Sequence, residues 1–315
     1  MRSLVTGAAG FVGRHLTRHL LSRGHEVGGL VHPSDAGVVL PDGVAVRSLD
    51  ILDEDAIEKA FRELSPEAVY HLAAFANPEG SWREARRTLE TNVIGAHNVL
   101  QAANATGKRP RVLLVGSAQQ YGEVPEGEQP IREDRELQPL TPYAVSKTSQ
   151  ELLGQRSFRS GELPVFCTRS FNHTGPGQSD GYVCSSFARQ VAEVEKGLRE
   201  PVIRVGNLEA LRDFSDVRDI VRGYWLALDG GCEPGEAYNL CSGKDYSIRE
   251  VLTKLIELSG VHVEIKEDPS RLRPSDVPVL LGDASRFRKA TGWTPRIPYE
   301  RTLADMLDYW RAEID

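Results

Sequence analysis

The first half of the chain alternates between short apolar runs and longer stretches that carry apolar residues at helical spacing. The apolar runs predict strands at Ser3–Thr6, Glu26–Val31, Val44–Ser48, Ala68–Leu72, Arg111–Val115 and Val165–Arg169. The stretches between them predict helices at Phe11–Arg23, Asp53–Leu64 (with Asp53 as its N-cap), Ser81–Thr106 and Pro142–Arg159. Strands that alternate with helices pair in parallel through right-handed crossovers. The pattern therefore predicts an α/β fold built on a Rossmann-type, doubly wound parallel sheet.

After Phe171 this rhythm breaks into loops rich in glycine and proline over Asn172–Gly181, followed by shorter elements. Helices are predicted at Ser185–Gly197, Asp216–Leu228, Ser247–Leu258, Asp283–Ala290 and Tyr299–Ala312, and strands at Val202–Val205, Ala237–Leu240 and Val263–Ile265. We expect residues 1–171 to form the dinucleotide-binding domain, with 214–245 returning to it. Residues 172–213 and 246–315 would form a smaller, discontinuous α/β lobe that binds the substrate.

Composition narrows the class of protein. With 315 residues, 40% of them hydrophobic and 26% charged, the chain can bury a large core and a smaller one. The net charge of −7 argues against general affinity for nucleic acid or for an anionic membrane. No apolar run is long enough for a membrane helix, and a strand starting near residue 2 leaves no room for a signal peptide.

The cysteines and histidines do not have the spacing of metal ligands. Cys167, Cys184, Cys232 and Cys241 show no C-x-x-C pattern, so we expect reduced thiols in a cytoplasmic protein. His15 and His19 are one helical turn apart but lack a third ligand nearby, and they are interpreted as exposed helix residues. We therefore expect no metal site.

The most informative motif is the segment Thr6–Gly13, which lies between the first predicted strand and the first predicted helix. Gly7, Gly10 and Gly13 allow a tight turn that brings backbone N–H groups and a helix N-terminus against a pyrophosphate. The spacing is G-x-x-G-x-x-G instead of G-x-G-x-x-G, but the strand–turn–helix context is the expected one. The turn, including Phe11 and Val12, predicts a nicotinamide dinucleotide site.

The end of the second predicted strand bears on which dinucleotide is bound. An acid there would hold a free ribose hydroxyl, whereas a basic residue would suit a 2′-phosphate. The segment Leu30–Ser34 contains His32 but neither an acid nor an arginine, which favours NADP slightly and leaves NAD open. The other expected cofactor contacts follow the third and fourth strands or lie on the next helix: Asp50, Ile51, Leu72, Ala73, Ala74 and Asn92. For Asn92, a buried structural amide is the alternative interpretation.

Tyr143 and Lys147 lie one turn apart on the same face of a predicted helix, and Ser117 lies at the end of the fifth predicted strand. A tyrosine normally titrates near ~10, too high for an ideal proton-transfer group at neutral pH. A cation ~4 Å away at an effective dielectric constant of ~20 contributes ~4 kcal/mol, or about three pKa units. We therefore expect Lys147 to lower the pKa of Tyr143 towards neutrality, with Ser117 hydrogen-bonded to the same substrate oxygen. Tyr143 and Lys147 would also contact the cofactor.

The glycine turn, Ser117 and the Tyr143/Lys147 pair together resemble the extended short-chain dehydrogenase/reductases, over essentially the whole chain. The segments Arg169–Gly177, Val205–Phe214 and Arg273–Val277 followed by Leu281–Asp283 are similar to the branch of GDP-mannose dehydratases and GDP-4-keto-6-deoxymannose reductases. The resemblance implies a GDP-sugar substrate and a homodimer. The substrate contacts that it implies in these segments are Asn172, Asn207, Arg212 and Arg273; the two arginines suit a diphosphate.

Gln119 distinguishes the reactions of this branch. In the dehydratases the corresponding position carries a Glu that works on the C5 proton, and a glutamine has no proton-transfer equilibrium near neutral pH. The resemblance therefore implies reduction of the 4-keto group of GDP-4-dehydro-6-deoxy-D-mannose to GDP-D-rhamnose, with Gln119 contacting the substrate. Two alternatives remain: a GDP-mannose 4,6-dehydratase or nucleotide-sugar 4-epimerase with internally cycled cofactor, and a dinucleotide-binding sensor without enzymatic activity.

Overall fold

The protein is described by a computed structural model that covers residues 1–35, 37–77, 80–269 and 277–314. Seven strands form one parallel sheet with the order β10-β6-β5-β4-β1-β2-β3. The strands are β1 (Arg2–Thr6), β2 (Glu26–Val31), β3 (Val44–Ser48), β4 (Ala68–His71), β5 (Arg111–Ser117), β6 (Val165–Ser170) and β10 (Ala237–Leu240). The order reverses between β1 and β4, which places a ligand-binding crevice at the carboxyl ends of these two strands. The predicted fold class is confirmed.

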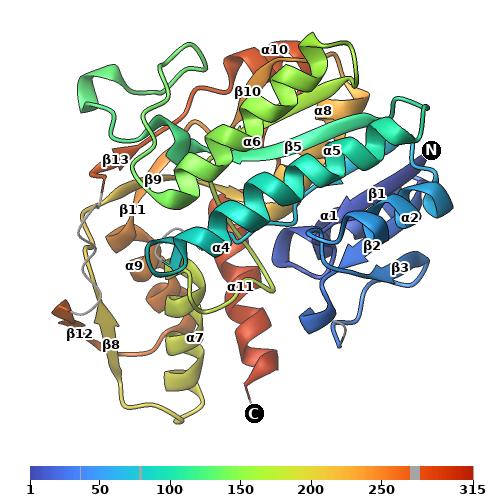
Figure 1. The fold of residues 1–315 in the computed structure, drawn as a ribbon. Helices are drawn as coiled ribbons and strands as arrows, with labels where there is room; N and C mark the ends of the chain where they lie inside the picture. Colours follow the sequence, from blue (N-terminus) through green and yellow to red (C-terminus); the bar gives the residue numbers. More distant parts are fainter. Residues whose placement is uncertain (36, 78–79, 270–276, 315) are drawn as a thin grey trace.

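Helices cover both faces of this sheet (Figure 1). On one face, α1 (Phe11–Ser22) packs against α8 (Val217–Asp229). On the other face, α2 (Glu54–Leu64) packs against α5 (Gly95–Ala105), which packs against α6 (Pro142–Arg159). Asp53 caps α2 as expected: its side chain accepts a hydrogen bond from Ala56 N at 3.0 Å.

Most of the remaining elements form a second group, whose helices and whose two-stranded sheet lie at the lower left and bottom of Figure 1. Its helices are α7 (Val183–Glu195), α9 (Ile248–Ser259) and α11 (Tyr299–Glu313), which pack against one another. Its strands form two small sheets: β7 (Asn172–Thr174), β9 (Leu211–Asp216), β11 (Asp245–Ser247) and β13 (Val279–Leu280) in one, and β8 (Val202–Val205) with β12 (Glu264–Glu267) in the other. The short helix α10 (Ser285–Thr291) lies apart from this group, against β10 at the top of Figure 1.

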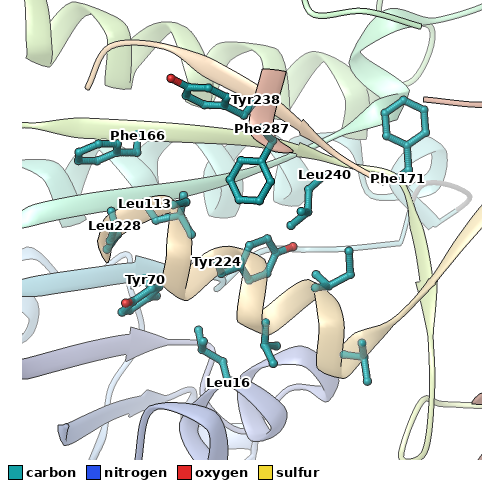
Figure 2. Packing of buried hydrophobic residues seen from close by; sticks show 14 of the residues in the cluster. Leu16, Tyr70, Leu113, Phe166, Phe171, Tyr224, Leu228, Tyr238, Leu240 and Phe287 are labelled. Carbon is teal, nitrogen blue, oxygen red and sulfur yellow. The ribbon is translucent and has the colours of Figure 1, made fainter. Parts of the chain in front are cut away.

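Among the described residues, three apolar cores hold these elements together: one on each face of the large sheet and one inside the second group, with the third of the three lying between the sheet and the helices α2 and α5. The first joins side chains of α1 and α8 to the sheet, and Figure 2 shows Leu16, Tyr70, Leu113, Tyr224 and Leu228 within it. The second lies among α7, α9, α11, β8 and β9. Phe287 and Trp293 belong to the first core although they follow residue 246. The segment that we expected in the substrate lobe therefore contributes to the first and the second of these cores.

The predicted single helix Ser81–Thr106 is wrong. The structure instead has α3 (Gly80–Arg83), α4 (Ala85–Leu89), a π-helical segment (Glu90–Ile94) and then α5. Glu84, with φ −118° and ψ 41°, separates the first two helices. The π-helical turn occurs where the Asn92 side chain bonds away from its own helix, to the backbone of Phe75.

The strands β7 and β9 were not predicted from the sequence. β7 lies inside the segment expected to be loop, and its residues Asn172, His173 and Thr174 lack apolar alternation. Its pairing with β9 joins Asn172 to Phe214 in register, more than forty positions further along the chain. A strand held by such a distant partner leaves no local signal. Within the described ranges, no helix combines the length and hydrophobicity needed to cross a membrane.

Candidate active site

The glycine turn follows β1 and leads directly into α1. Gly7 has a φ of +66°, and a Cβ there would lie 2.8 Å from Ala73 N at the end of β4. A Cβ on Gly13 would lie 2.2 Å from Gly7 O, so the helix can approach the strand only with glycine at this position. Gly10 is the N-cap of α1, which has no side-chain cap and no acidic residue in its first turn. The first N–H groups of α1 are thus open to an anion such as a pyrophosphate.

A cavity of about 820 Å³ extends from this turn across the carboxyl ends of the central strands. It brings together residues that directly follow β1 and β4 and residues of α1, β2, β5, α6, β6 and β7. The sequence-predicted residues that line it are Gly7, Gly10, Phe11, Val12, Gly13, His32, Asp50, Ile51, Leu72, Ala73, Ala74, Ser117, Gln119, Tyr143, Lys147 and Asn172. Most of the candidate residues therefore share one site, although they are spread over the first 172 positions.

One end of the cavity lies beside the ends of β2 and β3. His32 Nδ1 accepts a hydrogen bond from Ser34 N at 3.2 Å, and His32 Nε2 lies 3.7 Å from Asp50 Oδ2. Asp35 also lines the cavity, from the short 3-10 turn Pro33–Asp35. Asp35 directly follows the segment Leu30–Ser34. A carboxylate therefore lies near the end of β2, although the segment Leu30–Ser34 itself contains none.

Ser117 and Tyr143 reach the cavity from two adjacent elements. Ser117 is the last residue of β5, and its Oγ accepts a hydrogen bond from Gln119 N at 3.2 Å. Tyr143 lies in the first turn of α6, which begins at the N-cap Thr141 and at Pro142 in the first helical position. Burial, with a smaller contribution from the neighbouring Tyr182, raises the pKa of Tyr143 to about 12. A hydrogen bond from the Ser117 side chain acts to lower this pKa.

Lys147 does not have the effect on Tyr143 that the sequence suggested. Its Nζ donates to Val115 O at 2.8 Å and to Gln150 Oε1 at 3.1 Å, and burial lowers the pKa of Lys147 to about 7. The predicted shift of the Tyr143 pKa towards neutrality is therefore wrong in this structure. The physical reason is that the ammonium is bonded to the backbone of β5, while the phenol loses solvent.

Asn92 lies behind the cavity wall and does not line it. Its side chain is fully buried; Oδ1 accepts from Phe75 N at 2.7 Å and Nδ2 donates to Ser146 Oγ at 2.8 Å. Phe75 lines the cavity, and Ser146 lies on α6 between Tyr143 and Lys147. The direct cofactor contact expected of Asn92 is thus replaced by a structural one, which ties the cavity wall to α6.

The expected substrate residues separate into two groups. Gln119 and Asn172 line the cavity, whereas Asn207 and Arg212 do not. Asn207 Oδ1 accepts a hydrogen bond from Glu209 N at 2.9 Å, and Arg212 on β9 donates to the carbonyl oxygens of Leu211 and Pro278. Arg273 lies outside the described residues.

Several residues line the cavity that the sequence did not single out. Arg14 follows Gly13 and donates to Gly177 O at 3.1 Å. Its position directly after the glycine turn was the available signal. His173 and Tyr182 also line the cavity, and Tyr182 donates to Ala76 O at 3.0 Å. No local pattern marks these two, because distant pairing brings them to the site.

His15 differs from the prediction that it is exposed. It is half-buried, and its Nε2 bonds to Pro176 O at 2.9 Å, so α1 holds the loop that follows β7. Among the residues that the structure describes, no three His, Cys, Asp or Glu side chains gather as a metal site.

Comparison with known proteins places this site in a family. Residues 4–306 match the profile described as GDP-mannose 4,6 dehydratase. The chain is 36% identical over 313 residues to a GDP-6-deoxy-D-mannose reductase from Pseudomonas aeruginosa, covering 99% of this chain and 98% of that protein. It is 26% identical to a GDP-mannose 4,6-dehydratase from Vibrio cholerae, covering 97% and 92%.

Solved structures agree with these sequence relationships. RMD from Pseudomonas aeruginosa, complexed with NADPH, superimposes with a TM-score of 0.89 at 34% identity, with both chains fully covered. A UDP-glucose 4-epimerase from Thermotoga maritima, with UDP-glucose, gives a TM-score of 0.91 at 28% identity, again over both chains. The profile match and the full-length identity together show that this chain belongs to the GDP-mannose 4,6 dehydratase family.

Proposed function

We propose that this protein reduces the 4-keto group of GDP-4-dehydro-6-deoxy-D-mannose to give GDP-D-rhamnose, with NADPH or NADH as the hydride donor. The observation that carries the proposal is the convergence of Ser117, Tyr143 and Lys147 with the glycine turn in one cavity, where Gln119 also lies. The full-length similarity to a GDP-6-deoxy-D-mannose reductase supports the same reaction.

The cavity fits a nicotinamide dinucleotide. The uncapped N-terminus of α1 and the close glycine packing suit a pyrophosphate, and Ala73 and Ala74 leave room beside β4. A bound reduced dinucleotide supplies the hydride that is added to C4 of the sugar. Related structures are described with NADPH and with NAD.

The residues of the chain supply the proton and hold the substrate oxygen. Tyr143, protonated throughout the neutral range, donates its proton to O4 as C4 receives the hydride, so the carbonyl becomes a hydroxyl. Ser117 Oγ already accepts a hydrogen bond from Gln119 N, so the Ser117 hydroxyl is free to donate its own proton in a hydrogen bond to O4. A protonated Lys147 stabilises the phenolate that remains.

For the substrate we propose Gln119 and Asn172 at the sugar end of the site. Asn207, Arg212 and Arg273 are proposed contacts of the GDP portion. Arg212 lies on β9, whose Phe214 pairs with Asn172 on β7, so the strand that carries Arg212 adjoins the cavity wall. Guanidinium groups match the geometry of a diphosphate.

Incubation of purified protein with GDP-4-dehydro-6-deoxy-D-mannose and either reduced dinucleotide tests the reaction. We expect loss of absorbance at 340 nm and a GDP-D-rhamnose product identified by NMR. Unoxidised cofactor would contradict the proposal. A Tyr143→Phe variant that retained full activity would contradict the role of Tyr143, and absence of any turnover would favour the dinucleotide sensor.

The second candidate is a GDP-mannose 4,6-dehydratase, which the family relationship favours. Dehydration requires a group that moves the C5 proton, in addition to Tyr143 at O4, and the amide of Gln119 cannot do this. We expect no conversion of GDP-mannose in the presence of catalytic NADP⁺. If a carboxylate is the missing element, Gln119→Glu should gain measurable dehydration; conversion of GDP-mannose by the unaltered protein would favour the dehydratase.

We propose further that the protein is a homodimer of the cytoplasm. Large apolar side chains are exposed along one helical face: Leu89 on α4, Ile94 in the π-helical segment, and Val145 and Leu152 on α6. The elements that carry these residues are neighbours, because α4 and the π-helical segment both contact α6. Exposed apolar residues on neighbouring helices are typical of a protein interface. The four cysteines are free thiols, which suits a reducing compartment.

We also propose the division into a dinucleotide-binding domain (1–171 with 214–245) and a nucleotide-sugar lobe (172–213 with 246–315). The position of α8 and β10 on the first sheet supports the return of the chain, and the second apolar core supports a separate lobe.

A further inference from the structure

A network of buried polar side chains lies directly behind Ser117. Its members are Gln120, fully buried, Glu151 with 3% of its surface exposed, and Arg169 with 6% exposed. They come from three elements: the 3-10 turn Ala118–Tyr121 that follows β5, the helix α6, and the strand β6. Burying such groups is costly unless each has a partner, so their contacts are informative.

Gln120 joins the backbone of Ser117 to Glu151. Gln120 Oε1 accepts from Ser117 N at 2.8 Å, and Gln120 Nε2 donates to Glu151 Oε2 at 2.8 Å. An amide side chain accepts from an N–H group through its oxygen and donates to a carboxylate through its nitrogen, without a change of protonation. The turn is built around this side chain, because a Cβ on Gly116 would lie 2.3 Å from Gln120 Oε1.

Glu151 is itself fixed by a two-pronged ion pair. Arg169 Nε lies 3.0 Å from Glu151 Oε2, and Arg169 Nη2 lies 2.7 Å from Glu151 Oε1. Glu151 follows Lys147 by one helical turn and Tyr143 by two, so it lies on the face of α6 that carries both. The end of β5 and the catalytic face of α6 are therefore connected through one amide.

We propose that Gln120 is a positioning residue, which sets the place of Ser117 relative to Tyr143 by bridging Ser117 N and the Glu151–Arg169 pair. The proposal rests on the reductase activity proposed above. Gln120 does not line the cavity and so acts through Ser117. An error of about 1 Å in the position of a group that contacts the reacting oxygen can lower a rate by orders of magnitude.

The decisive comparison is between Gln120→Met and Gln155→Met. Gln155 Nε2 also donates to Glu151, at 3.2 Å, but Gln155 has no bond to Ser117. Each variant removes one amide bond to the same carboxylate. We expect Gln120→Met to lower kcat about tenfold with little change in KM for the sugar nucleotide. Gln155→Met should leave kcat within about twofold of wild type, because surface-side changes of this kind are small.

Two further measurements separate positioning from a loss of stability. In a Ser117→Ala background, Gln120→Met should lower kcat no further, since the residue that it positions is gone. In Gln120→Glu, a protonated carboxyl can replace the amide, whereas an ionised one faces Glu151 and cannot donate. The ionisable groups in this network are Glu151 on α6, Arg169 on β6 and Tyr121 in the 3-10 turn, whose hydroxyl accepts from Arg169. The ratio of variant to wild-type kcat should therefore fall as pH rises.

The outcomes are distinct. A wild-type protein without turnover would overturn the proposed function, and this proposal with it. An active wild type with an equally active Gln120→Met would overturn this proposal alone, as would an equal loss in Gln155→Met or additive losses with Ser117→Ala. If Gln120→Met does not fold, a pH-independent ratio for Gln120→Glu would overturn it.

Discussion

At the residue scale, burial sets the protonation of the two ionisable side chains that we place beside the reacting carbonyl. The pKa of Tyr143 is raised to about 12, so its phenol holds a proton at any working pH. The pKa of Lys147 is lowered to about 7, so its charge is lost within the working range. A reduction needs a proton on Tyr143 at the start and a cation nearby at the end. Of these two conditions, the second is the one that depends on pH.

The rate of reduction should therefore fall as pH rises above about 7, because Lys147 loses its proton there. A group with a lowered pKa is charged below that value and neutral above it, so the stabilising cation is present only on the acid side. kcat measured between pH 6 and 10 with saturating substrates checks this. Lys147→Arg, which stays charged, should remove the decline even if its overall rate is lower. If kcat of this variant fell with pH as it does in the wild type, the titration of another group would cause the decline.

The carboxylates at the adenosine end of the cavity should influence the choice of dinucleotide. Asp35 and Asp50 line this end with His32, and neither carboxylate favours a 2′-phosphate. Asp35→Ser should raise the ratio of kcat/KM for NADPH to that for NADH about threefold to fivefold, a modest change because solvent screens the site. Asp42→Ser removes the same charge from a residue outside the cavity lining and is the control. An equal ratio in all three proteins would exclude a role for Asp35.

At the element scale, the glycine turn is a joint between β1, β4 and α1. Gly13→Ala would place a Cβ 2.2 Å from Gly7 O, which backbone atoms can relieve only by moving α1. Overpacking of this kind typically costs about 1–3 kcal/mol. We expect a lower melting temperature and at least tenfold weaker NADPH binding by fluorescence titration. Gly127→Ala, where a Cβ would meet nothing within 4 Å, should change neither. Unaltered binding in Gly13→Ala would show that the turn tolerates a side chain.

The elements predicted best are those whose signals lie within the element. The strands Glu26–Val31, Val44–Ser48 and Ala237–Leu240 and the helix Pro142–Arg159 have the predicted bounds, because apolar runs, caps and spacing are local. The π-helical turn around Asn92 and the strand β7 depend on partners far along the chain, at Phe75 and at β9. Tertiary bonds of this kind override local propensity and cannot be derived from a single sequence.

The same distinction applies to the site. The glycine turn and the Tyr143/Lys147 spacing are short motifs, and the structure places both on one cavity. Where a side chain points was less predictable: the Lys147 ammonium bonds to Val115 O, and Asn92 faces Phe75 and Ser146. Such details depend on which neighbours packing supplies. The sequence therefore indicates which residues form the site. The protonation states of Tyr143 and Lys147 depend on burial and on hydrogen-bond partners, which local motifs do not specify.

At the scale of the whole molecule, the apolar core of the second group is joined to the large sheet through the active site. Asn172 and His173 on β7 line the cavity, and β7 pairs with β9, which contributes to the second core. Arg14 and His15 on α1 hold the carbonyl oxygens of Gly177 and Pro176 in the following loop. The wall that faces the dinucleotide turn is thus anchored to both halves. A change in the second core can reach the reacting groups by this route.

The exposed apolar face of α4 and α6 gives the last prediction. Leu152 is 56% exposed on α6, and Val145 is 41% exposed two turns before it. Exposed apolar patches of this kind mark sites where another protein binds. A C2 dimer would place the same residues of two chains against each other. Leu152→Glu would bring two carboxylates into that interface, so we expect a dimer to become a monomer in sedimentation-velocity runs. Leu198→Glu, where the leucine is 59% exposed outside any helix, should leave the dimer intact. A wild-type monomer, or a Leu152→Glu dimer of unchanged affinity, would place the interface elsewhere or remove it.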